Sequence, residues 1–159
     1  MSYWEASKSH VGSFMGRTTR FGKIDGPTEL YSFSSRTDRP SKPDPERPGK
    51  ADPMYFLAGS ALTQAIRGAR HDAEGKALRE TIRQGIALCE DWNAMTYLFI
   101  LEVPAGFHVE AWFGLAKFQP RIERGDAGGQ SFGGGWLQYI VDLNELTSMY
   151  LRGPIATGW

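Results

Sequence analysis

Hydrophobic and polar positions alternate with a period of two over Thr28–Ser34, in the first quarter of the chain. Leu30 and Ser32 fall on one face of this segment, whereas Tyr31 and Phe33 fall on the other. This alternation is typical of a strand that is buried on one side. We therefore expect a short strand at this position.

A helical spacing follows the short apolar run of residues 54–57. Apolar residues recur on one face from Ala61 to Ala69, and Ser60 is a suitable N-cap residue. Basic side chains between residues 67 and 83 fall mostly off the apolar stripe, where they form either a solvated face or a surface for phosphate groups. A second helix is predicted from four side chains at nearly fourfold spacing: Leu78, Ile82, Ile86 and Cys89.

The last third of the chain is strand-like. The expected strands cover residues 95–103, 108–113 and 136–141, with a turn at 104–106 and a stop at Gly114. The run at 95–103 is the most apolar and is the candidate central strand. Residues 144–151 predict a helical turn or a last short strand, and residues 151–154 are expected to end regular structure. The order of strand, helices and further strands predicts an α+β domain with segregated elements.

Residues 35–53 differ in character from the segments around them. They hold five of the nine prolines and nine charged side chains of mixed sign. We interpret this segment as a mobile, extended loop that is too polar to be packed. It is either a solvated surface loop or a lid that contacts a partner.

Length and composition place all 159 residues, 1–159, in one domain with a real core. Aromatic residues at 13% and nineteen glycines favour a β-rich fold. The net charge of zero gives no general attraction to nucleic acid or membrane. No apolar run approaches the length of a membrane span, and residues 1–10 lack the apolar region of a signal peptide. We therefore expect a protein that works in a reducing or neutral, cytosol-like setting, or one that reaches its place by a route other than an N-terminal signal.

Several chemical classes have no motif in the sequence. There is no Walker loop, no dinucleotide-binding glycine fingerprint and no nucleophile elbow. The lone Cys89 cannot form an internal disulfide and is expected to be a small core residue. No metal site is expected, because the three histidines lack a second ligand at suitable spacing on their own elements: His10, His71 and His108.

Three consecutive glycines, Gly133, Gly134 and Gly135, precede an apolar strand interrupted only by the amide of Gln138. Such a triplet indicates either backbone conformations that other residues avoid or close packing against the main chain. Gln138 then lies on the solvent face of an edge strand after a hairpin turn, or it faces a ligand beside a glycine-rich loop. Spacing alone leaves both interpretations open.

Three segments, at residues 26–31, 103–114 and 133–141, resemble parts of the ADP-ribosyltransferase-like toxin domains of bacterial polymorphic toxins, including Rhs proteins. The first is similar to their opening strand, the second to a "VPxG…VWxG" strand pair, and the third to a "GGGxxQ" strand. The third segment and residues 112–114 also resemble NAD glycohydrolase toxins of the tuberculosis-necrotizing-toxin type, whose early Arg-Phe-Gly element is similar to residues 20–22.

The resemblance implies an ADP-ribosyltransferase-like fold. In it, two small antiparallel sheets form a cleft for NAD⁺, with helices inserted after the first strands. The nicotinamide–ribose bond breaks through an oxocarbenium-like transition state, which needs a group that holds the ribose hydroxyls. Gln138 stands where the superfamily usually has a glutamate, so the resemblance makes it the catalytic residue. The glycine triplet would border the bound NAD⁺.

The resemblance also implies residues that contact the rest of NAD⁺. The family's arginine for the pyrophosphate follows the tyrosine of the opening strand, but here Ser32 follows Tyr31. Arg20 and Arg36 are the nearest substitutes, and a guanidinium matches phosphate oxygens well. Three aromatic side chains are candidates for stacking on nicotinamide: Tyr55, Phe56 and Trp112.

Three functions follow as hypotheses. The first is a bacterial effector toxin that transfers ADP-ribose from NAD⁺ to a protein or nucleic acid. The second is an NAD⁺ glycohydrolase, favoured because no clear second catalytic acid stands just before Gln138. The third is a β-rich binding module without activity, consistent with Ser32 in the place of the arginine.

The toxin hypothesis also implies partners and a location. We expect a cognate immunity protein that blocks the cleft or the loop at residues 35–53, and no membrane partner. The domain would be secreted as part of an effector and act in the cytoplasm of a target cell.

Overall fold

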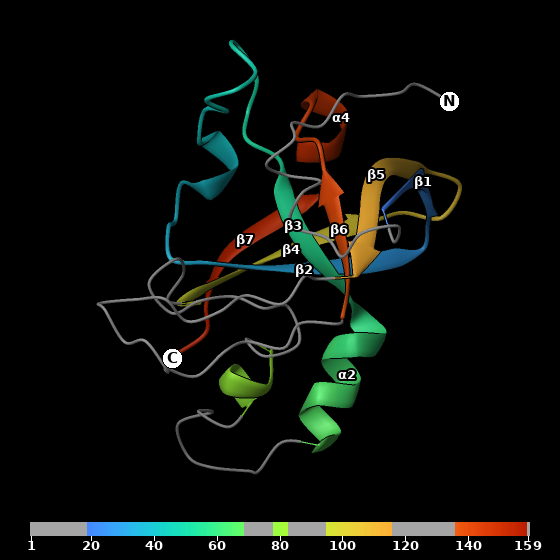
Figure 1. The fold of residues 1–159 in the computed structure, drawn as a ribbon, viewed down its shortest axis with the longest axis vertical. Coiled ribbons are helices and arrows are strands. Elements are labelled where there is room, and N and C mark those ends of the chain that lie inside the picture. Colours follow the sequence, from blue (N-terminus) through green and yellow to red (C-terminus); the bar gives the residue numbers. More distant parts are fainter. Residues whose placement is uncertain (1–18, 69–77, 83–94, 116–135, 159) are drawn as a thin grey trace.

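The chain folds around one antiparallel sheet, in a computed structural model that describes residues 19–68, 78–82, 95–115 and 136–158 (Figure 1). The described strands are β1 (Arg20–Asp25), β2 (Thr28–Ser34), β3 (Met54–Ala58), β4 (Tyr97–Val103), β5 (His108–Leu115), β6 (Leu137–Val141) and β7 (Leu151–Ala156). The helices are α2 (Gly59–Gly68), α4 (Glu145–Ser148) and a short 3₁₀ helix at Arg39–Ser41, and residues 78–82 are also helical.

The described strands lie in the order β1-β5-β6-β3-β2-β4-β7, and every neighbouring pair is antiparallel. The contact between β2 and β3 is narrow, because it joins only two residue pairs, whereas β2 and β4 share seven. In Figure 1, β3 and β6 run nearly upright and β2 crosses them. The described strands therefore form one hydrogen-bonded sheet, whose two halves meet at this narrow contact, and not the two separate small sheets that were expected. The α+β class holds in the coarse sense of a largely antiparallel sheet with short helices.

The core lies on the face of the sheet that the β2 alternation predicts. Leu30, Ser32 and Ser34 are buried, and Leu30 packs with Phe99 and Leu101 of β4 in the main apolar cluster. Tyr31 and Phe33 lie on the opposite face and pack against a second cluster formed by Leu57, Ile82 and Met95. The predicted strand and its two faces are thus confirmed. Burial of the alternating apolar side chains fixes the register of β2.

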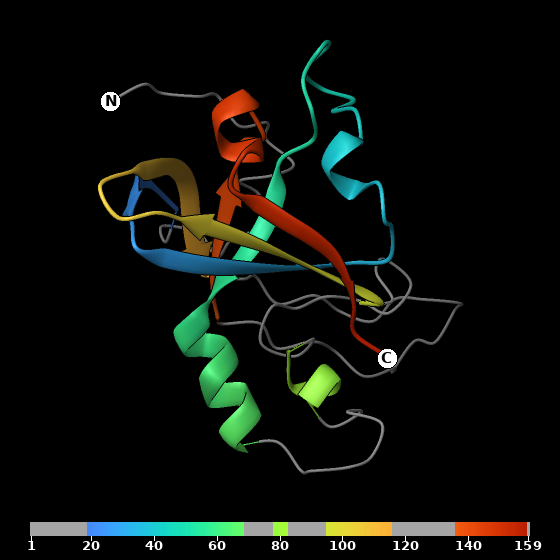
Figure 2. The same cartoon turned by 180° about the vertical axis from the view of Figure 1, so that it is seen from behind.

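Two helical segments lie below the sheet in the views of Figures 1 and 2. Helix α2 begins at Gly59, directly after the last residue of β3, so Ser60 is inside its first turn and is not the N-cap as expected. The boundary differs because no linker separates strand from helix. In the second predicted helix, residues 78–82 are helical and Ile82 is buried, while Ile86 and Cys89 lie outside the described residues.

Strands β4 and β5 were both predicted, but the place of β4 in the sheet and the end of β5 differ from the prediction. β4 lies next to the edge strand β7, so the most apolar run is not the centre of the sheet, a place that β3 takes. It is apolar because Phe99, Leu101 and Val103 belong to the main apolar cluster, which does not require the middle position. Strand β5 continues through Gly114 to Leu115, because its pairing with β6 extends that far.

The end of the chain contains both elements that were expected as alternatives. Helix α4 is capped by Asn144, whose side-chain oxygen accepts a hydrogen bond from the Thr147 amide at 2.9 Å. Strand β7 then spans Gly153 and Pro154, so the prediction that these residues end regular structure is wrong. Proline is tolerated because β7 is an edge strand, which needs no second set of ladder hydrogen bonds.

The Pro-rich segment is largely exposed, as expected of a surface loop, but it is packed at a few positions, which the prediction that it is too polar to pack did not foresee. Asp44 and Asp52 are only 4% and 7% exposed. Arg39 forms an ion pair with Asp52 at 3.0 Å, and Arg47 bridges Asp44 and Asp142 at 2.6 and 2.9 Å. Asp44 and Asp52 can be buried because each is paired with a cation, and a buried pair avoids the penalty of an isolated ion.

Candidate functional site

Gln138 lies on β6, an interior strand between β5 and β3. The residue is only 7% exposed. Its backbone pairs with Leu57 on one side and with Gly114 on the other. The interpretation of Gln138 as a solvent-facing residue of an edge strand is therefore wrong. Strand pairing distant in sequence buries this position, which the spacing of residues could not show.

The side-chain amide of Gln138 has no hydrogen-bond partner among the described residues. Buried polar groups are nearly always hydrogen-bonded, and an unsatisfied one costs about 1–3 kcal/mol. Gly114 opposite it has no side chain, so the β5 side of the amide is not covered by a cross-strand neighbour. An amide with these surroundings can both donate to and accept from a bound molecule.

Tyr31 lies on the same face of the sheet as Gln138. Leu57 pairs with both residues, with Tyr31 on β2 and with Gln138 on β6, and directly paired residues share a face. This row crosses the narrow contact between the two halves of the sheet. Gln138 on β6 is therefore separated from the narrow β2–β3 contact by one strand, β3.

Two further aromatic candidates share this face. Tyr55 and Trp112 both pair with Ile140, two residues after Gln138 on β6. Trp112 also contacts the Phe21 ring, with centroids 5.2 Å apart. Side chains two residues apart on a strand lie on the same face, so Tyr55 and Trp112 flank the amide in the neighbouring row.

Phe56 and Ser32 lie on the other face. Phe56 is 1% exposed and belongs to the main apolar cluster with Leu30 and Met54. Ser32 is 5% exposed and pairs with Phe99. The structure therefore does not bring these two candidates together with Gln138.

The two candidate arginines lie away from the row of Gln138. Arg20 begins β1, the edge strand beyond β5, and donates to the Thr19 carbonyl at 2.9 Å. Arg36 follows β2 and makes two hydrogen bonds to the Asp38 carboxylate, at 2.8 and 2.9 Å. A phosphate at Arg36 would have to replace Asp38.

Some predicted residues lie outside the described part of the chain. Gly133, Gly134 and Gly135 do so, and of the basic side chains between 67 and 83 only that of Arg79 is described. Within the described residues, no three His, Cys, Asp or Glu side chains are placed to hold a metal ion. No helix among these residues is both long and apolar enough to cross a membrane.

The sequence analysis missed a cluster of charged side chains on β2, β4 and β7, next to Tyr31. The Tyr31 hydroxyl donates to the Glu29 carboxylate at 2.6 Å, and this bond, with burial, raises the pKa of Tyr31 to about 12. Glu29 pairs with Glu102 across β2 and β4, and Arg152 binds Glu102 at 3.0 Å. The alternation of β2 places Glu29 on the face of Tyr31, but the register with Glu102 and Arg152 is not local.

Comparison with protein-family models, curated proteins and solved structures finds no match to this chain. The resemblance to ADP-ribosyltransferase-like toxin domains therefore stays a prediction.

Proposed function

We propose that the chain is an NAD⁺-cleaving effector domain in which the Gln138 amide binds the nicotinamide ribose. The observation that supports this most is the amide itself, 7% exposed on an interior strand and without a hydrogen-bond partner among the described residues. A protein core gains nothing from such a group, whereas a sugar diol supplies both a donor and an acceptor for it.

The proposed reaction breaks the bond between the anomeric carbon of the ribose and the nicotinamide nitrogen. The bonding electron pair leaves with nicotinamide, which becomes neutral, and an acceptor oxygen or nitrogen attacks the anomeric carbon and loses its proton. Gln138 would hold the ribose hydroxyls in the geometry of the oxocarbenium-like transition state. Its neutral amide supplies orientation and dipole without a full negative charge.

Aromatic side chains on the same face support a planar ligand. Tyr31 lies in the same row of the sheet as Gln138, and Tyr55 and Trp112 lie in the neighbouring row. We propose that one of them stacks on nicotinamide. The glycine triplet at residues 133–135 would border the bound dinucleotide, and Arg20 or Arg36 would contact its pyrophosphate.

We propose a macromolecule, protein or nucleic acid, as the ADP-ribose acceptor, and transfer to water as the second candidate. One observation favours water. None of the residues that pair directly with Gln138 or Leu57 carries a carboxylate, and the Glu29 carboxylate on the same face already accepts a hydrogen bond from the Tyr31 hydroxyl at 2.6 Å. In either case a dedicated immunity protein would protect the producing cell, and the target would be a recipient cell's cytoplasm.

The test measures nicotinamide release from NAD⁺ by the wild type, Gln138→Ala and Gln138→Glu, with and without cell lysate. We expect Gln138→Ala to lose at least about a hundredfold in turnover. Turnover without lysate indicates a glycohydrolase, and label transfer that needs lysate indicates a transferase. If the wild type neither binds nor consumes NAD⁺ in either condition, the proposed function is wrong and a binding module remains.

A further inference from the structure

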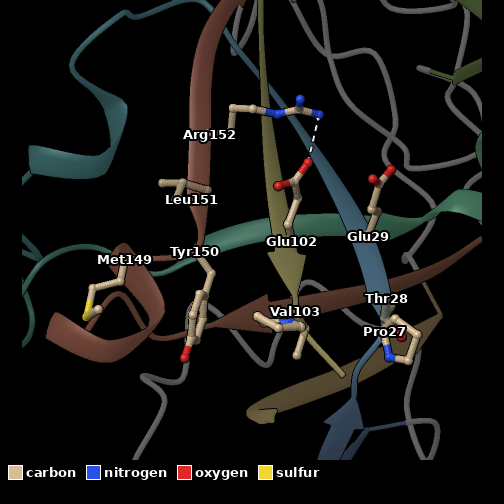
Figure 3. Close-up of a pocket in the computed structure, with 10 residues that line it drawn as sticks. Pro27, Thr28, Glu29, Glu102, Val103, Met149, Tyr150, Leu151 and Arg152 are labelled. Carbon is tan, nitrogen blue, oxygen red and sulfur yellow. Dashed lines mark ion pairs between the residues drawn. The ribbon is translucent and has the colours of Figure 1, made fainter. Parts of the chain in front are cut away.

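An open hollow of about 410 Å³ lies where β2, β4 and β7 meet the turn after α4 (Figure 3). It adjoins the row of Gln138, because its residue Glu29 accepts a hydrogen bond from the Tyr31 hydroxyl, but the inference drawn from it does not depend on the proposed function. Its floor carries three charged side chains, and its rim is largely apolar. The lining residues used below are Pro27, Glu29, Glu102, Met149, Tyr150 and Arg152.

Two glutamates stand side by side on the floor of the hollow. Glu29 of β2 and Glu102 of β4 are directly paired and therefore point to the same face. Like charges directly opposite each other destabilise an antiparallel pair. A cation beside such a pair offsets the repulsion.

The compensation within the described residues is incomplete. Arg152 forms an ion pair with Glu102 at 3.0 Å, and Figure 3 shows Glu29 on the far side of Glu102 from Arg152. Glu29 accepts a hydrogen bond from the neutral Tyr31 hydroxyl at 2.6 Å, but it has no ion pair with a described residue. The two carboxylates and one guanidinium leave a net charge of minus one at the hollow.

The rim presents exposed apolar side chains next to this charge. Met149 lines the hollow and is 75% exposed. Phe107 is not a lining residue, but it is 51% exposed and contacts the ring of the lining residue Tyr150, with centroids 5.8 Å apart. In Figure 3, Pro27 lies on the opposite side of the hollow from Met149. Exposed large apolar residues gathered around a polar floor are typical of a surface that contacts another molecule.

We propose that this hollow binds a lysine or arginine side chain of a partner protein. The cationic head of this side chain would pair with Glu29. Its apolar stem, and an adjacent residue of the partner, would lie against Met149 and Tyr150. Long basic side chains combine a charged tip with an apolar stem, which matches a charged floor under an apolar rim. Nucleic acid fits poorly because the carboxylates repel phosphate. A metal ion fits poorly because Arg152 already occupies one carboxylate.

The test uses the ¹⁵N-labelled full chain at low salt. Its amide shifts are followed while N-acetyl-Leu-Arg-Leu-amide is added, beside the matched peptide with glutamate in place of arginine. We expect saturable shifts at Glu102, Tyr150 and Arg152 with the arginine peptide only. Glu29→Gln is expected to weaken binding about threefold to fivefold. Glu46→Gln removes an equal charge from the Pro-rich segment and is expected to leave binding unchanged.

A second variant keeps the proposal open to refutation if Glu29→Gln folds poorly. Met149→Ser changes a side chain that is 75% exposed and is expected to weaken binding about twofold. The proposal is overturned by equal responses to both peptides, by no saturable shift at millimolar peptide, or by unchanged affinity in the well-folded Glu29→Gln and Met149→Ser variants. Shifts at these residues with calcium chloride alone, and none with the arginine peptide, would also overturn it.

Discussion

The Arg47 guanidinium donates to the Asp142 carboxylate at 2.9 Å, although the two residues are 95 positions apart in the sequence. The same guanidinium binds Asp44 at 2.6 Å and the Ala51 carbonyl at 2.8 Å. Arg47 therefore ties the Pro-rich segment to the residue after the last position of β6, the strand that carries Gln138.

Arg47→Met is expected to destabilise the fold by about 3 kcal/mol, because it removes the cation that pairs at 2.6 Å with the Asp44 side chain, which is 0% exposed. Chemical denaturation followed by circular dichroism measures this. Arg36→Met is the matched control, since its pair with Asp38 is at least half exposed and should contribute less than about 1 kcal/mol. Equal losses in the two variants would mean that Arg47 is no more important than a surface cation.

Gln138→Leu is expected to stabilise the fold by about 1 kcal/mol while it abolishes NAD⁺ cleavage, because leucine removes the amide that lacks a partner. Residues that are kept for function at the expense of stability show this combination. Thermal unfolding and the nicotinamide assay provide the two measurements. A clear loss of stability would show that the amide has a structural role instead.

Tyr31 is expected to titrate with a pKa of about 12, because its hydroxyl donates to the Glu29 carboxylate and is partly buried. The folded pKa lies above the ordinary value of 10.0, so this bond stabilises the fold fully below pH 10 and its contribution is lost as the pH rises toward 12. NMR of ¹³Cζ-tyrosine measures the pKa, with Tyr31→Phe to assign the signal. Glu29→Gln should lower the pKa, and an unchanged value would rule out this cause.

Gly153→Ala is expected to cost about 2 kcal/mol or more. Its φ is +123°, and an added Cβ would lie 2.7 Å from the Leu98 carbonyl oxygen. Gly49→Ala is the control, because its φ is +78° and nothing lies within 4 Å of an added Cβ. That change should cost about 1 kcal/mol from the backbone alone. Denaturation midpoints that fall equally would show that β7 can shift to accept the methyl group.

The sequence predicted local features well and long-range ones poorly. The alternation in β2 and the strand around Gln138 are properties of a few adjacent residues, so both could be recognised. The interior position of β6 depends on its pairing with β3 and β5, which no local pattern reveals. The burial of charges in the Pro-rich segment was missed partly for the same reason, since one of the two carboxylates that pair with Arg47 is Asp142, 95 positions away in the sequence.

The narrow contact between β2 and β3 has a consequence for ligand binding. Within the described part of the chain, the two halves of the sheet are joined by two residue pairs, Leu30 with Ala58 and Tyr31 with Leu57. Tyr31 belongs to one half and Gln138 to the other. A ligand held by both side chains would act as a clamp across this seam, and it should slow amide hydrogen exchange at Tyr31 and Leu57 more than elsewhere in the sheet.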